Sequence, residues 1–144
     1  MKIIKYFFEF IIIITFFSIF KIIGYRNASN LGEKIGKIFG PLFRSSHVIQ
    51  KNLENLNDSY SHNEKKNIIK NMWGNYGRIF AEYMYLEKFR NNVLSGNIEI
   101  NGQKILDEII SKKEPVIFVS GHFNNFELMA MHLEKSGINL AAIY

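Results

Sequence analysis

The feature that most constrains this chain is a strongly apolar segment at residues 6–23, interrupted only by Glu9 and Lys21. A helix that spans a bilayer needs about 20 predominantly apolar residues. Both charges stand near the ends of the segment, so Lys21 can extend to the headgroups and Glu9 lies within reach of the interface. We therefore predict that residues 1–26 form a membrane anchor that either spans the bilayer once or is embedded in it.

Two alternatives to a retained anchor are a cleavable signal peptide and a buried core helix. Lys2 and Lys5 resemble the basic start of a signal peptide, but no Ala-x-Ala-like cleavage site follows the apolar segment. More Lys and Arg residues follow the segment than precede it. This asymmetry favours an anchor whose following chain lies in the cytoplasm.

Charge is distributed unevenly along the 144 residues, whose formal net charge is +5. Residues 1–45 hold seven of the 18 basic side chains and two of the 13 acidic ones, so the remaining residues are neutral. A basic excess beside an apolar segment suits an anionic membrane surface better than nucleic acid, which requires a basic patch on a folded face. The chain has no cysteine, which excludes disulfides and cysteine-ligated metal.

Helical patterns occupy much of the chain after the anchor. Ser61 and Glu64 have the spacing of a capping box, and an apolar stripe at intervals of three and four follows, so we predict one helix from about 61 to about 88. We take its aromatic side chains as a core face rather than a lipid groove. Gly74 and Gly77 within it predict a close contact with another element.

A second group of glycines stands between residues 26 and 46. Gly32, Gly36 and Gly40 recur at helical spacing, which predicts a helix that packs closely, on the membrane-proximal face. Pro41 is expected to end this helix, and residues 47–56 form another.

Short β-branched stretches in the second half predict strands. The alternation at 98–100, the apolar run at 116–120 and residues 138–144 are expected to be strands, with helices at 103–112 and 128–135 between them. A strand, helix, strand order predicts parallel pairing. The expected fold class is therefore α/β, with an anchor helix followed by helices and a partial, mainly parallel sheet.

The run at 116–120 leads into Gly121-His122-Phe123-Asn124-Asn125-Phe126-Glu127. A helix that begins near Asn124 would place Glu127 in its first turn and His122 on the loop before it. A carboxylate there can hold one imidazole nitrogen protonated and leave the other free to take a proton. His47, His62 and His132 have no comparable context, and no metal-ligand spacing occurs, so no metal is predicted.

A histidine separated by four residues from an acidic residue, after a hydrophobic strand, resembles the signature of the glycerolipid and lipid A acyltransferases. The longer motif is most similar to the lauroyl/myristoyl branch of lipid A biosynthesis. That branch commonly has Gly where Asn124 stands and Trp where Phe126 stands. The resemblance implies a glycerolipid acyltransferase-like fold, with residues 27–144 as the N-terminal half of the acyltransferase domain, so the chain is expected to be truncated and to show little activity alone.

The resemblance also implies the chemistry. An acyl carrier protein would donate a fatty acyl chain as a thioester to a hydroxyl of a lipid A precursor, with His122 as the base and Glu127 orienting it. No cofactor is expected. The site would lie on the cytoplasmic side of the bacterial inner membrane. Two alternatives stay open at this point: a glycerolipid or lysophospholipid acyltransferase with the same two residues, and a non-catalytic membrane-anchored remnant.

Overall fold

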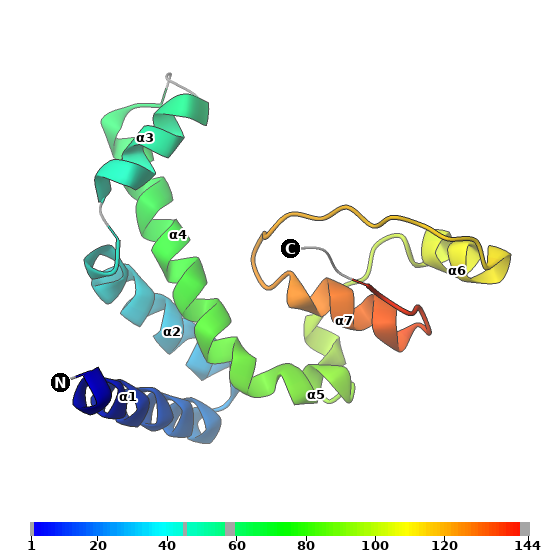
Figure 1. The fold of residues 1–144 in the computed structure, drawn as a ribbon, viewed down its shortest axis with the longest axis horizontal. Helices are drawn as coiled ribbons and strands as arrows, with labels where there is room; N and C mark the ends of the chain where they lie inside the picture. The colour runs from blue at the N-terminus through cyan, green and yellow to red at the C-terminus, as the bar shows by residue number, and fades with distance from the viewer. Residues whose placement is uncertain (1, 45, 57–59, 142–144) are drawn as a thin grey trace. The chain divides into compact units, whose positions relative to one another are not determined.

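A computed structural model describes residues 2–44, 46–56 and 60–141. The chain divides into two compact units, residues 1–84 and residues 85–144 (Figure 1). The helices of the first unit are α1 (Lys2–Ile23), α2 (Tyr25–Phe39), α3 (Ser46–Leu56) and α4 (His62–Glu82). Those of the second are α5 (Leu86–Arg90), α6 (Gln103–Lys112) and α7 (Glu127–Lys135).

α1 is long and apolar enough to cross a membrane, by its length and composition. Its 22 residues extend about 33 Å, close to the roughly 30 Å hydrocarbon core of a bilayer. The hydroxyls of Thr15 and Ser18 donate to backbone carbonyls one turn earlier, both at 2.8 Å, so these polar groups are satisfied within the helix. Phe20 alone among its described side chains is buried. The apolar helix is present as predicted, and its insertion into a membrane stays a prediction.

Glycines bring α2 and α4 into close contact, side by side in the first unit (Figure 1). A methyl group built on Gly32 would overlap the carbonyl oxygen of Gly77, and one built on Gly77 would overlap the carbonyl oxygen of Gly32. A methyl group on Gly36 would overlap the carbonyl oxygen of Trp73. The two helices approach this closely because neither has a side chain at the crossing. The predicted close contacts are confirmed, and the two glycine groups face each other.

A part-buried polar cluster also joins α2 to α4. Arg78 on α4 forms an ion pair with Glu33 on α2 and donates to the hydroxyl of Ser29 at 3.0 Å. That hydroxyl donates to Glu82 at 2.8 Å. Lys37 pairs with Glu33 from the next turn of α2. The hydrogen bond from Lys37, with the nearby charge of Arg78, holds the pKa of Glu33 below its ordinary value of 4.5.

α4 begins at the predicted capping box. The backbone N–H of Glu64 donates to the Ser61 hydroxyl at 3.3 Å, and the backbone N–H of Ser61 donates to the Glu64 carboxylate at 2.8 Å. The predicted single helix to about residue 88 is interrupted. α4 ends at Glu82, a 3-10 turn covers Tyr83–Tyr85, and α5 follows. Tyr85 is only 1% exposed, and it begins the second unit.

The predicted α/β fold with a partial parallel sheet is wrong, because the described residues contain helices and turns but no strand. Residues 98–100 and 116–120 have no regular structure, and the latter form an open connection between α6 and α7 (Figure 1). Residues 138–141 are likewise irregular, while 142–144 lie outside the described part of the chain. A strand requires a partner for its backbone hydrogen bonds, and β-branched side chains alone do not supply one. Ile117 and Val119 are each 92% exposed.

The second unit is held together by contacts around α7. Leu133 on α7 is buried, as are Phe89 on α5 and Leu106 on α6. Polar bonds connect the same helices, with Arg90 paired to Glu134 at 2.7 Å. The predicted helix at 103–112 is confirmed as α6. These contacts hold α7 in place within the second unit. The candidate catalytic residues lie at the N-terminal end of α7.

Candidate active site

His122 lies in a tight three-residue turn just ahead of α7. The backbone N–H of Phe123 donates to the carbonyl of Gly121 at 2.8 Å, so His122 is the central residue of this turn. A methyl group on Gly121 would come within 2.6 Å of the Phe123 ring. Glycine at this position therefore lets the Phe123 ring fold back over the backbone. The His122 side chain is exposed to solvent, as a base that meets a substrate must be.

An aromatic ring covers one face of the His122 imidazole. The Phe126 and His122 rings are stacked, with centroids 4.2 Å apart and planes at 29°. Such a stack restricts rotation of the imidazole and leaves its nitrogen-bearing edge accessible. From the sequence, Phe126 was only a replacement for the Trp of similar proteins. The structure shows its ring stacked on His122. The sequence signal for this contact was an aromatic residue four positions after the histidine.

Asn124 explains how the chain turns from the loop toward α7. Its φ is +48°, in the left-handed region that most side chains avoid. Asparagine tolerates this region better than other non-glycine residues. The resemblance placed a glycine here, and both residue types satisfy the same backbone requirement.

Glu127 is the first residue of α7, one position beyond Phe126, and is half-buried. The sequence predicted that this helix begins nearer Asn124, but Glu127 does lie in its first turn. A carboxylate here is favoured by the partial positive charge of the helix N-terminus. The structure therefore places His122 and Glu127 on one loop-to-helix corner. A hydrogen bond between the two side chains stays a prediction.

The remaining histidines belong to helices rather than to the loop that holds His122. His132, on α7, forms a hydrogen bond with Gln103 of α6 at 2.9 Å and so helps to join two helices. His47 and His62 belong to α3 and α4 of the first unit. Within the described residues, no group of three or more His, Asp or Glu side chains is placed to hold a metal ion.

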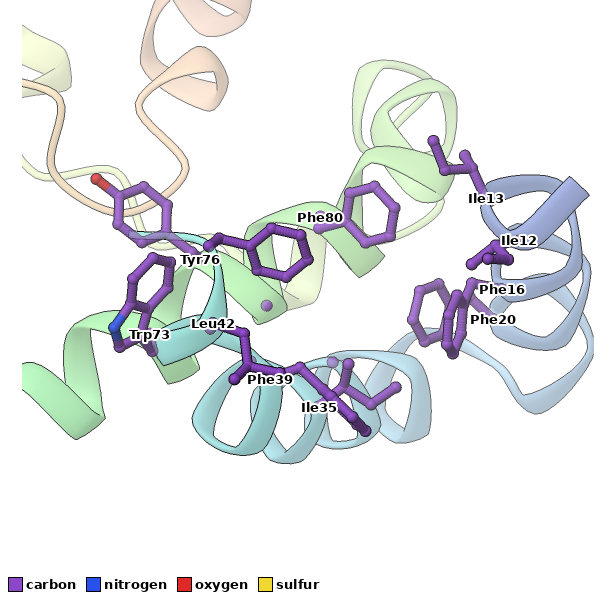
Figure 2. Close-up of a pocket in the computed structure, with 15 residues that line it drawn as sticks. Ile12, Ile13, Phe16, Phe20, Ile35, Phe39, Leu42, Trp73, Tyr76 and Phe80 are labelled. Carbon is purple, nitrogen blue, oxygen red and sulfur yellow. The ribbon is translucent and has the colours of Figure 1, made fainter. Parts of the chain in front are cut away.

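An apolar groove of about 570 Å³ lies within the first unit, between α1, α2, the turn at Gly40–Leu42 and α4. We call it the apolar groove. Ile12 and Phe16 of α1 face Ile35 of α2 and Tyr76 of α4 across it (Figure 2). The sequence predicted that the aromatic face of α4 packs on a sheet as part of the core, in preference to forming a lipid-chain groove. The described residues contain no sheet, and the aromatic face of α4 lines this groove instead.

Comparison with protein families agrees with the motif at His122. The sequence model of the bacterial lipid A biosynthesis acyltransferases matches residues 1–144. Neither a curated protein nor a solved structure matches the chain. The chain belongs to the bacterial lipid A biosynthesis acyltransferase family, and its role is therefore that of an acyltransferase in lipid A synthesis. Membership implies an acyl donor and a lipid A acceptor.

Proposed function

We propose that this protein transfers a fatty acyl chain from an acyl carrier protein thioester to a hydroxyl of a lipid A precursor, with His122 as general base. The observation that carries this proposal is the corner before α7, where an exposed imidazole is stacked on Phe126, the residue that directly precedes Glu127. The family match supports acyl transfer. The carrier protein as donor and the roles of the two residues are our inference.

In the proposed reaction, one imidazole nitrogen of His122 removes the proton of the acceptor hydroxyl while the hydroxyl oxygen attacks the thioester carbonyl carbon. The C–O bond forms, the C–S bond breaks, and the departing thiolate receives the proton from the imidazolium. A hydroxyl is a weak nucleophile at neutral pH, and a positioned base typically raises the rate about 10²–10⁴-fold.

Glu127 would accept a hydrogen bond from the second imidazole nitrogen. This bond fixes which nitrogen is free to act as the base, and the carboxylate stabilises the imidazolium that forms.

We place this reaction at the cytoplasmic face of the inner membrane, with α1 as the anchor. α1 has the length and composition to span a bilayer, and the basic residues that follow it favour a cytoplasmic location for the chain beyond. Lipid acceptors are confined to the membrane, so an anchored enzyme meets them without diffusing through solution.

The proposal is tested by measuring acyl transfer to different acceptors in membranes that contain this protein. We expect transfer from acyl carrier protein to a lipid A precursor and no transfer to glycerol 3-phosphate or to a lysophospholipid. Glu127→Gln should lower the rate because an amide cannot stabilise the imidazolium, whereas Glu134→Gln, which only breaks the ion pair with Arg90, is the matched control. Preferred transfer to a glycerol-based acceptor would contradict the proposal.

A further inference from the structure

We propose that the apolar groove binds one acyl chain of a membrane lipid. The inference rests on the membrane location of α1 and is independent of the catalytic roles of His122 and Glu127. The volume of about 570 Å³ falls within the range of roughly 300–1,000 Å³ that small-molecule sites occupy. All the groove residues belong to the first unit.

The walls of the groove are hydrocarbon. Ile12, Ile13 and Phe16 form the α1 wall, and side chains of α2 and α4 form the other (Figure 2). Phe17 and Phe80 bring α1 and α4 together, with ring centroids 5.0 Å apart. A polar ligand would lose its hydrogen bonds to water in such a site without gaining others. A chain of methylene groups forms no hydrogen bonds with water, and its burial is favourable.

Glycine backbone supplies part of the lining. A methyl group on Gly40 would come within 2.6 Å of atoms of the Trp73 ring, and Gly36 and Gly77 also line the groove. The side chains missing at these positions let α2 and α4 meet closely, so the glycine backbone itself lines the groove.

The groove shares α1 with the proposed membrane anchor, and this identifies the source of the ligand. Ile12 and Ile13 are 54% and 41% exposed although they line the groove. Exposed apolar side chains on a helix of this length are favourable when bilayer hydrocarbon surrounds them. A groove walled by such a helix is reached from within the bilayer, so we assign its occupant to a membrane lipid rather than to the donor thioester.

The single tryptophan of the chain, Trp73, lines the groove and provides the test. The full chain is placed in vesicles of phosphatidylethanolamine and phosphatidylglycerol whose acyl chains carry bromine at mid-chain, which quenches tryptophan on contact. We expect the loss of most Trp73 emission relative to vesicles of the same lipids without bromine. Unchanged emission would overturn the proposal.

A matched pair of cysteine variants separates the groove from the general lipid surface. The chain has no cysteine, so Ile13→Cys and Ile14→Cys each give one attachment point for an alkyl methanethiosulfonate. The two residues are adjacent and similarly exposed, at 41% and 46%, but only Ile13 lines the groove. The alkyl group on Ile13→Cys should fill the groove and restore Trp73 emission, and the one on Ile14→Cys should leave the quenching unchanged.

Two further results would overturn the proposal. One is equal quenching in both alkylated variants, with both shown to be helical and membrane-bound, because this would place Trp73 against bulk lipid. The other is quenching only when the brominated chain is supplied on acyl carrier protein, since this would assign the groove to the donor.

Discussion

At the scale of residues, the corner before α7 combines three separate backbone and side-chain requirements. Asn124 adopts a left-handed φ of +48°, Gly121 leaves room for the Phe123 ring, and Phe126 stacks on His122. The first two features set the path of the backbone around His122, and the third holds one face of its imidazole. Because positioning a reacting group accounts for a large part of many rate enhancements, we expect substitutions here to affect turnover more than stability.

Phe126 offers the sharpest test of positioning at this scale. Phe126→Ala removes the ring against which His122 is stacked, so the imidazole gains rotational freedom and kcat should fall about tenfold or more. Phe126→Trp keeps an aromatic face and should restore most of the activity. The measurement is steady-state acyl transfer, with circular dichroism to show that α7 persists. Equal kcat in the alanine and tryptophan variants would show that the stack has no part in positioning.

At the scale of elements, the packing of α2 on α4 depends on glycine. Gly77→Ala places a methyl group against the carbonyl oxygen of Gly32 and should separate the helices, with a loss in the free energy of unfolding of about 1–3 kcal/mol. Gly96→Ala is the control, since a methyl group there meets nothing within 4 Å. Urea unfolding in detergent measures both. If Gly77→Ala is no less stable than Gly96→Ala, the close crossing does not contribute to stability.

The ion pairs between α2 and α4 predict a dependence of stability on pH. The pKa of Glu33 is lowered in the folded state by the hydrogen bond from Lys37 and the charge of Arg78. Glu33 therefore contributes stability above its unfolded pKa of about 4.5, and this contribution is lost as the pH falls through the lower, folded value. Thermal unfolding between neutral and acidic pH should show a smaller acid-induced loss of Tm in Glu33→Gln than in the wild-type protein. An identical loss of Tm in the two proteins would show that Glu33 does not contribute to the pH dependence of stability.

Local signals in the sequence predicted several elements because local forces determine them. The capping box at Ser61 and Glu64 and the helix at 103–112 required only hydrogen bonds and apolar spacing within a few residues. The strand predicted at 116–120 failed because its β-branched residues find no partner strand in the described part of the chain. The apolar groove was not predictable from local signals, since it lies between α1 and the pair α2 and α4, which meet at glycines distant in the sequence.

The sequence indicated the candidate site residues, whose catalytic roles stay a prediction, but it did not indicate the geometry of the corner that holds them. His122 and Glu127 stood out by spacing, and Glu127 begins α7 in the structure. The stack on Phe126 and the left-handed Asn124 depend on the path of the backbone between them. Side-chain spacing alone does not determine that path.

At the scale of the whole molecule, α1 is the proposed attachment to the membrane. Deleting residues 1–26 should move the protein from the membrane pellet to the soluble fraction, because no other described helix is long and apolar enough to span a bilayer. The measurement is fractionation followed by a carbonate wash. Undiminished recovery in the membrane would assign the attachment to other apolar residues, such as Leu42 and Phe43, which are 80% and 83% exposed.

The central claim is that His122 is the base in acyl transfer to a lipid A precursor. The most direct measurement compares the rate of transfer from acyl carrier protein by the wild-type gene product with the rates of His122→Ala and His132→Ala. His132 is the matched control because it joins α7 to α6 through Gln103 and has no proposed part in the chemistry. We predict a loss of about 10²–10⁴-fold for His122→Ala and near-normal transfer for His132→Ala. Near-normal transfer by His122→Ala, in a protein that keeps its helical content, would contradict the account.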